Sequence, residues 1–436
     1  MFMRSLDKTM NLRSLVYLAK FRRNLRLNVE ELKQIQQQKM KAIITYAYEN
    51  VPFYKKKFKN AGITPDDIKS ILDLSKIPFT TKSELQMSTL NDLIPRTNNV
   101  NTYIQKSTSG STGIPLNIFK CKKTLDAEEA IWVRTLLENG LKLRDKMAEI
   151  GDPRHFPDQR SLSERLHFIR RKRLSIFDDA ETQMKILKDY APDVIKGYTS
   201  SLTLLVEEMK KKQCTIKPRI LFTTAELLDN ETRLLIRSGL ETDLLDNYAC
   251  TEFGLLGWEC HNHSGYHINM DNIIMEFIKD GETISSEEQG EIVCTSLNNY
   301  AMPLIRYRME DVGIPQMENC SCGVMLPLMK TIEGRKDDFL ITVEGQKISP
   351  TVFFPYPFEN TNNIRQFRVI QEKRDRLKIE IVFKKGDVNP TLFEKATVNI
   401  KSLFGEEMQV DFQVLEKIID DKKKMRKIVS KISVPW

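Results

Sequence analysis

The chain has 436 residues, of which 41% are hydrophobic and 29% are charged, and its formal net charge is +8. This length favours two or more domains, and this composition is typical of a globular protein with a large buried core. The sequence has no apolar run long enough to cross a bilayer, and an odd set of seven Cys without regular spacing argues against a disulfide scaffold.

The positive charge is concentrated at the N-terminus, where residues 1–60 contain 14 Lys or Arg and 4 Asp or Glu. Such a segment can contact nucleic acid or an anionic membrane, but a solvated amphipathic cover is the commoner case. The segment lacks the known modules of nucleic-acid-binding proteins, so we expect no nucleic-acid partner. It also lacks the apolar core and cleavage site of a signal peptide, so we expect a cytoplasmic protein.

The first third of the chain is predicted to be mainly helical. Apolar residues at helical spacing predict a helix within 28–60 that Pro52 interrupts. Thr81 is a candidate N-cap with Glu84 three residues later, and residues 123–140 predict another helix.

From about residue 147, short apolar runs alternate with helical patterns as far as the stretch "CTEFG" at 250–254. This periodicity favours a largely parallel sheet, whose ligands bind at the carboxyl ends of the strands. After residue 265 the pattern becomes β-rich. Beyond Gly334 the pattern predicts a small α+β unit. We therefore expect an N-terminal domain over 1–335, with a helical cover at 1–60 and a β-rich part at 260–325, and a C-terminal lid domain over 336–436.

The stretch "QKSTSGSTGIPL" at 105–116 is rich in Ser, Thr and Gly. Hydroxyl groups and backbone N–H groups in such a loop can surround phosphate oxygens, although the spacing and the Lys of a Walker loop are missing. By itself, such a stretch is more often a linker.

Later in the chain, four motifs contain side chains that could bind a nucleotide, its phosphates or a metal ion. "YACTEFG" at 248–254 combines an aromatic ring with Thr251 and Glu252, and a carboxylate beside phosphates can hold Mg²⁺. "IRYRMEDVG" places Asp311 after a predicted strand, and "EGRKDDFL" supplies Arg335 and an acidic hinge. The tail "DDKKKMRKIVSKI" supplies lysines, although a solvated charge run is the usual interpretation of such a tail.

These motifs, together with "TTAELL" at 223–228, occur in the order that resembles the adenylate-forming superfamily of acyl-CoA synthetases. The resemblance covers nearly the whole chain and is strongest to the phenylacetate–CoA ligase-like branch. Within that branch it is nearest to proteins of capsular polysaccharide biosynthesis and to synthetases that adenylylate a deazaflavin coenzyme. It implies an α/β fold, with a large N-terminal domain of mainly parallel sheets and a β-rich part, and a small mobile α+β C-terminal domain.

The resemblance also implies roles for individual residues. Tyr248 would stack on adenine, Asp311 and Arg335 would contact the ribose, Thr251 would contact the α-phosphate, and Glu252 would bind Mg²⁺. Ala225 and Glu226 would line the adenine site. The phosphate loop would comprise Ser107, Thr108, Ser109, Gly110, Ser111, Thr112 and Gly113. Lys424 is the candidate catalytic lysine of the tail, with Lys423 and Lys427 as alternatives.

A second group of residues has the chemistry of a zinc site. Cys260, Cys320 and Cys322 would supply three thiolates, and His267 or His263 the fourth ligand, in a closed structural Cys₃His centre. His267 is preferred, because relatives with the Cys-x-Cys turn carry a His seven residues after the first Cys. The alternative is a set of ordinary buried thiols and surface histidines.

The predicted function is ATP-dependent activation of a small carboxylic acid through acyl-AMP, with CoA as the acceptor. One alternative passes the acyl or AMP group to a sugar amine, a carrier thiol or a coenzyme. A third, non-catalytic interpretation makes the chain a binding protein on this fold. Relatives that form dimers suggest a homodimer.

Overall fold

The computed structural model describes residues 12–96, 100–108, 116–153, 156, 170–285, 287–335, 338–348, 353, 364–383, 390–416, 418 and 427–432. Its α-helices are α1 (Leu12–Asn24), α2 (Val29–Asn50), α3 (Pro52–Asn60), α4 (Lys82–Met87), α5 (Leu90–Leu93), α6 (Lys122–Glu138), α8 (Ala180–Tyr190), α9 (Thr199–Lys211), α10 (Asn230–Leu240) and α12 (Pro390–Phe404). Among these described residues, no helix is both long and apolar enough to cross a membrane.

The predicted helix at 28–60 is two helices, α2 and α3, since the break falls at Val51 and Pro52 occupies the first turn of α3. The predicted cap at Thr81 is confirmed. Its side chain accepts a hydrogen bond from Glu84 N, and the Glu84 carboxylate accepts one from Thr81 N, which forms a capping box at the start of α4.

One twelve-stranded sheet runs through the N-terminal domain in the order β11-β10-β12-β13-β14-β9-β8-β7-β6-β5-β3-β4. Its strands are β3 (Lys146–Gly151), β4 (Arg170–Ser175), β5 (Val194–Tyr198), β6 (Ile220–Thr224), β7 (Leu244–Cys250), β8 (Gly254–Glu259), β9 (Tyr266–Ile268), β10 (Ile273–Lys279), β11 (Glu282–Thr283), β12 (Gly290–Ser296), β13 (Tyr307–Gln316) and β14 (Leu328–Arg335). Strands β4, β3, β5, β6 and β7 are parallel, and antiparallel pairing begins at β7–β8.

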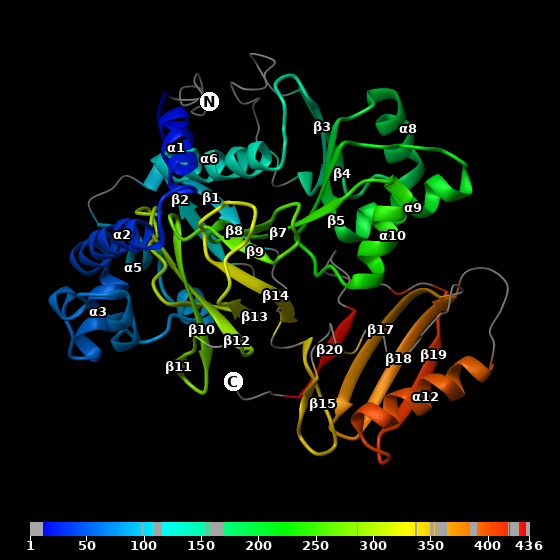
Figure 1. Ribbon diagram of the computed structural model, residues 1–436. Helices are drawn as coiled ribbons and strands as arrows, with labels where there is room; N and C mark the ends of the chain where they lie inside the picture. The colour runs from blue at the N-terminus through cyan, green and yellow to red at the C-terminus, as the bar shows by residue number, and fades with distance from the viewer. Residues whose placement is uncertain are drawn as a thin grey trace.

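The parallel strands are covered by helices on both faces (Figure 1). Residues of α8, α9 and α10, including Leu187, Leu202 and Ile236, pack on one face. On the other face, Leu136 of α6 packs against Phe222 and Leu245. The inner strands β6 and β7 are buried along most of their length and begin with apolar residues, as strands covered on both faces usually do, whereas the edge strand β4 is basic and partly exposed.

The smaller strands lie outside this sheet. They are β1 (Ile104–Ser107), β2 (Asn117–Lys120), β15 (Leu340–Ile341), β16 (Lys347–Ile348), β17 (Ile364–Lys373), β18 (Arg376–Phe383), β19 (Gln409–Val414) and β20 (Ile428–Ser430). The last four form a separate sheet in the order β19-β18-β17-β20, which α12 covers through Ile400 and Phe404. This C-terminal domain stands beside the large sheet in Figure 1.

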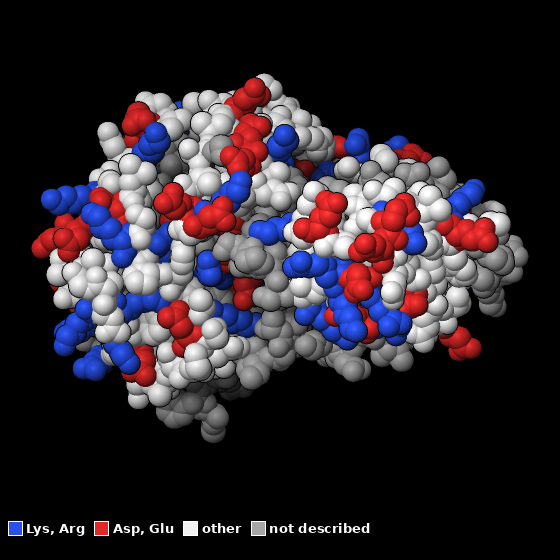
Figure 2. All heavy atoms as spheres, turned by 90° about the horizontal axis from the view of Figure 1, so that it is seen from below, with Lys and Arg blue, Asp and Glu red and all other residues white. Residues whose placement is uncertain are grey.

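Charges on the underside of the molecule are mixed. Figure 2 shows Lys and Arg interspersed with Asp and Glu over both domains. The basic helix α1 is likewise tied to acidic residues of α6, since Arg13 pairs with Asp126 and Arg22 with Glu138. These pairs attach α1 to α6, and the predicted cover over 1–60 stays a prediction.

Candidate active site and metal centre

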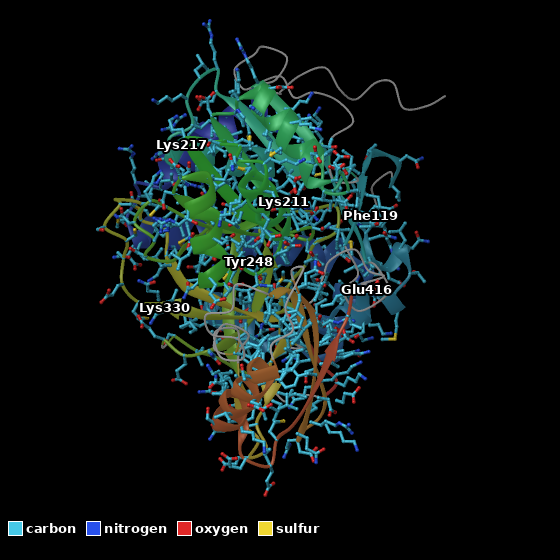
Figure 3. The ribbon with its side chains drawn as sticks, turned by 90° about the vertical axis from the view of Figure 1, so that its right-hand side faces the viewer. Phe119, Lys211, Lys217, Tyr248, Lys330 and Glu416 are labelled. Atoms are coloured by element: carbon cyan, nitrogen blue, oxygen red, sulfur yellow. The ribbon has the colours of Figure 1, made fainter. Side chains whose placement is uncertain are left out.

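Strand β7 brings Tyr248 to the carboxyl end of the parallel strands, where it contacts Asp311 of β13. Tyr248 is buried near the end of β7, and its hydroxyl donates a hydrogen bond of 2.7 Å to Asp311 Oδ2. Burial and the neighbouring Asp311 carboxylate raise the pKa of Tyr248 well above its ordinary value, so the phenol keeps its proton. Figure 3 shows Tyr248 near the centre of the molecule, above the C-terminal domain.

Thr251 and Glu252 follow directly in the turn between β7 and β8, and both are half-buried. Because this turn directly follows the buried strand β7, the strand fixes its position, while the side chains of Thr251 and Glu252 remain partly exposed to solvent. The structure therefore brings Tyr248, Asp311, Thr251 and Glu252 to one region.

The prediction that Asp311 follows a strand is wrong, because it lies inside β13. The strand continues to Gln316, with register shifts on either side of Gly313. Gly313 permits this continuation, since a Cβ there would lie 2.8 Å from the sulfur of Met329. Asp311 is the Cα partner of Arg335 on β14, so the backbone aligns the two residues predicted to contact the ribose.

Ala225 and Glu226 form the start of the loop that follows β6. Ala225 has a positive φ of 72°, which turns the chain sharply at the strand end. The Glu226 carboxylate then accepts hydrogen bonds from Ser200 N at 2.7 Å and Ser200 Oγ at 3.0 Å. This contact fixes the loop to the N-terminus of α9.

The stretch predicted to form a phosphate loop begins at the antiparallel pair of β1 and β2. Thr108 N donates to Leu116 O, and Leu116 N donates to Thr108 Oγ1, both at 3.0 Å. Ser107 Oγ lies 2.6 Å from Asn117 Oδ1. Ser109, Gly110, Ser111, Thr112 and Gly113 lie outside the described residues, as do Lys423 and Lys424 of the tail.

Of the three candidate tail lysines, Lys427 is described, and it links the two domains. Its Nζ lies 3.0 Å from Asp229 Oδ2, and Asp229 is the N-cap of α10, accepting hydrogen bonds from Thr232 N and Thr232 Oγ1 at 2.8 Å. Our interpretation of the sequence missed Asp229. An Asp three residues before a Thr at the start of a helical pattern was the available signal.

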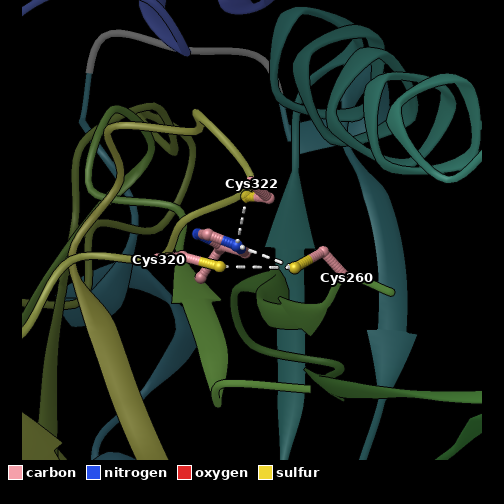
Figure 4. Close-up of side chains that lie close together, drawn as sticks. Cys260, Cys320 and Cys322 are labelled. Atoms are coloured by element: carbon pink, nitrogen blue, oxygen red, sulfur yellow. Dashed lines mark hydrogen bonds between the residues drawn. The ribbon is translucent and has the colours of Figure 1, made fainter. Parts of the chain in front are cut away.

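Four of the predicted metal ligands lie together. The ligand atoms of Cys260, His267, Cys320 and Cys322 all lie within 4.8 Å of one another (Figure 4). His267 Nε2 is 3.4 Å from both Cys260 Sγ and Cys322 Sγ, and Cys260 Sγ is 3.6 Å from Cys320 Sγ. Burial lowers the pKa of His267 to about 4, so its ring is neutral and can offer a lone pair.

The alternative ligand His263 has other partners. Its Nε2 lies 2.8 Å from Asp243 Oδ2, and its Nδ1 lies 3.8 Å from Glu259 Oε2. His267 is therefore the histidine that the fold places among the thiols.

Comparison with known proteins supports the architecture. The CapK C-terminal domain family matches residues 340–431. The chain is 27% identical to the phenylacetate-coenzyme A ligase of Escherichia coli over 410 residues, covering 87% of this chain and 90% of that enzyme. It is also 27% identical over 335 residues to the phenylacetate-coenzyme A ligase of Thermus thermophilus, covering 74% of each chain.

Among solved structures, 2-hydroxyisobutyryl-CoA ligase in its postadenylation state superposes with a TM-score of 0.79 at 16% identity, over 94% of this chain and 91% of that one. The same ligase in its thioesterification state gives a TM-score of 0.65 at 18% identity, over 94% and 91%. The chain therefore has homologues among the phenylacetate-coenzyme A ligases and the fold of the adenylate-forming acyl-CoA ligases.

Proposed function

We propose that this protein activates a carboxylic acid with ATP, forming acyl-AMP and pyrophosphate, and then transfers the acyl group to the thiol of CoA. The observation that carries the proposal is the Tyr248–Asp311 contact beside the Thr251–Glu252 turn. It presents an aromatic face, a carboxylate for the ribose hydroxyls and a second carboxylate within one region at the carboxyl ends of the strands, where nucleotides bind in α/β sheets.

The proposed reaction has two displacements. In the first, an oxygen of the acid attacks the α-phosphorus of ATP, and the bond to pyrophosphate breaks. In the second, the thiol of CoA attacks the acyl carbon, loses its proton, and AMP leaves. The protein contributes mainly position and charge to such steps. Tyr248 and Asp311 would hold the nucleoside, and Thr251 would donate to the α-phosphate.

Glu252 fits a magnesium ligand, because it is a half-buried carboxylate adjacent to the residue that would contact the phosphate. When bound, Mg²⁺ would offset the negative charge of the phosphates. Lys424 is the proposed source of a further positive charge.

The cysteine cluster supports a second proposal, a structural Zn²⁺ bound by Cys260, His267, Cys320 and Cys322. Three sulfurs and one nitrogen within 4.8 Å match the donor set and the size of a closed tetrahedral site. A reducing compartment keeps such thiols available, which agrees with the cytoplasmic location that we propose.

Metal analysis of the purified protein should give one zinc per chain. Cys320→Ser should lose that zinc and lower the melting temperature, whereas Cys214→Ser, in a half-buried thiol outside the cluster, should retain it. Equal zinc content in both variants would disprove the site.

We also propose a second candidate function, in which an acceptor other than CoA takes the acyl or AMP group; the relatives named for CoA are 27% identical to this chain, and residues 340–431 match a different family, the CapK C-terminal domain. Both candidates share the adenylation step. The homodimer expected from relatives stays a prediction, which sedimentation can test.

Pyrophosphate release should be measured with a library of carboxylic acids, with and without CoA, followed by mass spectrometry of the products. We expect release that depends on one class of acid and a thioester when CoA is present. Glu252→Gln should reduce release about 100-fold or more, as removal of a charge-stabilising group does. Pyrophosphate release by Glu252→Gln at the wild-type rate would contradict the proposed role of Glu252.

A further inference from the structure

Asn247 is a buried amide that the protein leaves without hydrogen bonds. It lies on β7, one residue before Tyr248, and only 3% of it is exposed. Neither its Oδ1 nor its Nδ2 has a hydrogen-bond partner. Buried polar side chains are nearly always paired, so an amide with two unpaired groups needs an explanation.

Other buried amides of the described chain show how fully this fold satisfies such groups. Asn269 donates to Leu255 O and accepts from Trp258 Nε1 and Arg134 Nη2. Asn299 donates to Phe119 O and Met302 O and accepts from Ala301 N. Within the described residues, Asn247 is the only amide whose buried oxygen and nitrogen both lack a partner.

The position of Asn247 points to a ligand. In the register of the parallel strands, Asn247 is paired with Thr224 on β6, and Thr224 is paired with Tyr198 on β5. Paired residues of neighbouring strands lie on the same face of a sheet. The three therefore form a polar row across the carboxyl ends of three strands.

The next residues inward along the same face are apolar on two of these strands, since Leu245 pairs with Phe222 and both belong to the cluster under α6. The polar row of Asn247, Thr224 and Tyr198 therefore lies next to apolar residues of the same face, Leu245 and Phe222. An acid whose carboxylate lies near Thr251 would extend its chain along this row.

We propose that Asn247 determines the specificity of the acid site, and that the acid carries a hydroxyl or carboxamide group on its acyl chain. This inference rests on the proposed adenylation. An amide offers one oxygen acceptor and one NH₂ donor, and hydroxyl and carboxamide groups both donate and accept, whereas an alkyl or unsubstituted phenyl chain does neither.

A site built to hydrogen-bond a substrate discriminates strongly against the analogue that lacks the group, because the buried polar atoms of the site are then left unpaired. We therefore expect kcat/KM to favour the polar member of matched acids by about 100-fold or more. Suitable pairs are 4-hydroxyphenylacetic and phenylacetic acid, 3-hydroxybutyric and butyric acid, and succinamic and pentanoic acid.

The test measures ATP–pyrophosphate exchange with these pairs for the wild type and for Asn247→Leu, which has a similar volume and no polar atoms. The variant should reverse the preference toward the apolar member. Because it removes no hydrogen bond within the protein, its melting temperature should equal or exceed that of the wild type.

Asn269→Leu is the matched control. It should lower the melting temperature, because it removes the acceptor of the buried Trp258 Nε1 and one acceptor of Arg134 Nη2, and it should keep the preference for the polar acid. An unchanged preference in Asn247→Leu would show that the amide binds only water and would overturn the inference. Exchange with apolar acids alone in the wild type would overturn it and leave the proposed function intact, whereas no exchange with any acid would overturn both.

Discussion

At the scale of single residues, the Tyr248–Asp311 hydrogen bond connects stability to nucleotide binding. Tyr248→Phe removes a donor to a half-buried carboxylate and should lower the free energy of unfolding by about 1–3 kcal/mol. It should also raise the KM for ATP, because Asp311 loses the contact that orients it toward the ribose. Chemical denaturation and steady-state kinetics measure the two effects.

Tyr266→Phe provides the control, since Tyr266 also donates to a carboxylate, that of the buried Asp246, at 2.6 Å. This variant should lose a similar amount of stability and keep the wild-type KM for ATP. If both variants changed the KM equally, the effect would come from lost stability, and the assignment of Asp311 to the ribose would fail.

Glu149 predicts a dependence of stability on pH. Burial alone would raise its pKa, but the positive charges of Lys196, Arg171 and Arg173 outweigh burial and hold the pKa at about 2. A carboxyl group with a lowered folded-state pKa stabilises the fold above its ordinary pKa of about 4.3, and this stabilisation is lost as the pH falls toward 2.

Glu149→Gln should therefore be less stable than the wild type at pH 7 by about 3 kcal/mol, because it leaves Lys196 without its partner at 3.0 Å. The gap between the two proteins should narrow from about pH 4.3 downward. Urea denaturation at several pH values measures it. A gap that is constant between pH 7 and pH 2 would contradict the assigned pKa.

At the scale of elements, local patterns were readable and long-range pairing was not. The alternation after residue 147 predicted β3 and the helices α8, α9 and α10 because each element signals itself within about ten residues. The single sheet that joins β4 to β11 depends on pairings such as that of Leu328 on β14 with His267 on β9, which no local pattern encodes. The β-rich pattern after residue 265 did not show where its strands begin and end, and the first part of it forms β9 and β10.

The features of the candidate site likewise fall into two groups, those that sequence motifs predict and those that depend on neighbours in space. The order of motifs predicted Tyr248, Thr251, Glu252 and Asp311 as site residues through the resemblance that it carries, and their roles stay predictions; the structure shows the Tyr248–Asp311 contact. The unpaired state of Asn247 and the Lys427–Asp229 contact could not be read, because both depend on what lies nearby in space.

The N-cap of α10 leads to a prediction about that helix. Asp229→Asn keeps a good capping side chain, whereas Asp229→Ala removes the cap and should cost about 1 kcal/mol more in stability. Both variants lose the ion pair with Lys427 equally, so the difference between them isolates the cap. Thermal unfolding measures it, and identical melting temperatures would show that Thr232 N finds another acceptor.

At the scale of the whole molecule, the ion pair of Lys427 with Asp229 joins the C-terminal domain to the N-terminus of α10. The arrangement superposes better on the postadenylation state of 2-hydroxyisobutyryl-CoA ligase than on its thioesterification state, with TM-scores of 0.79 and 0.65. We predict that the C-terminal domain rotates between the two half-reactions and that this ion pair forms in only one of the two arrangements.

A double-mutant cycle separates this role from catalysis by the tail. If Lys427 only binds Asp229, then Asp229→Asn and Lys427→Met should slow pyrophosphate release by a similar factor, and the double variant should be no slower than either, because each removes the same interaction. Lys424→Met should instead nearly abolish release while leaving the ion pair in place. If Lys427→Met were far slower than Asp229→Asn, and Lys424→Met were close to wild type, then Lys427 would be the catalytic lysine, and its contact with Asp229 would be the position it occupies when its charge is not needed at the α-phosphate.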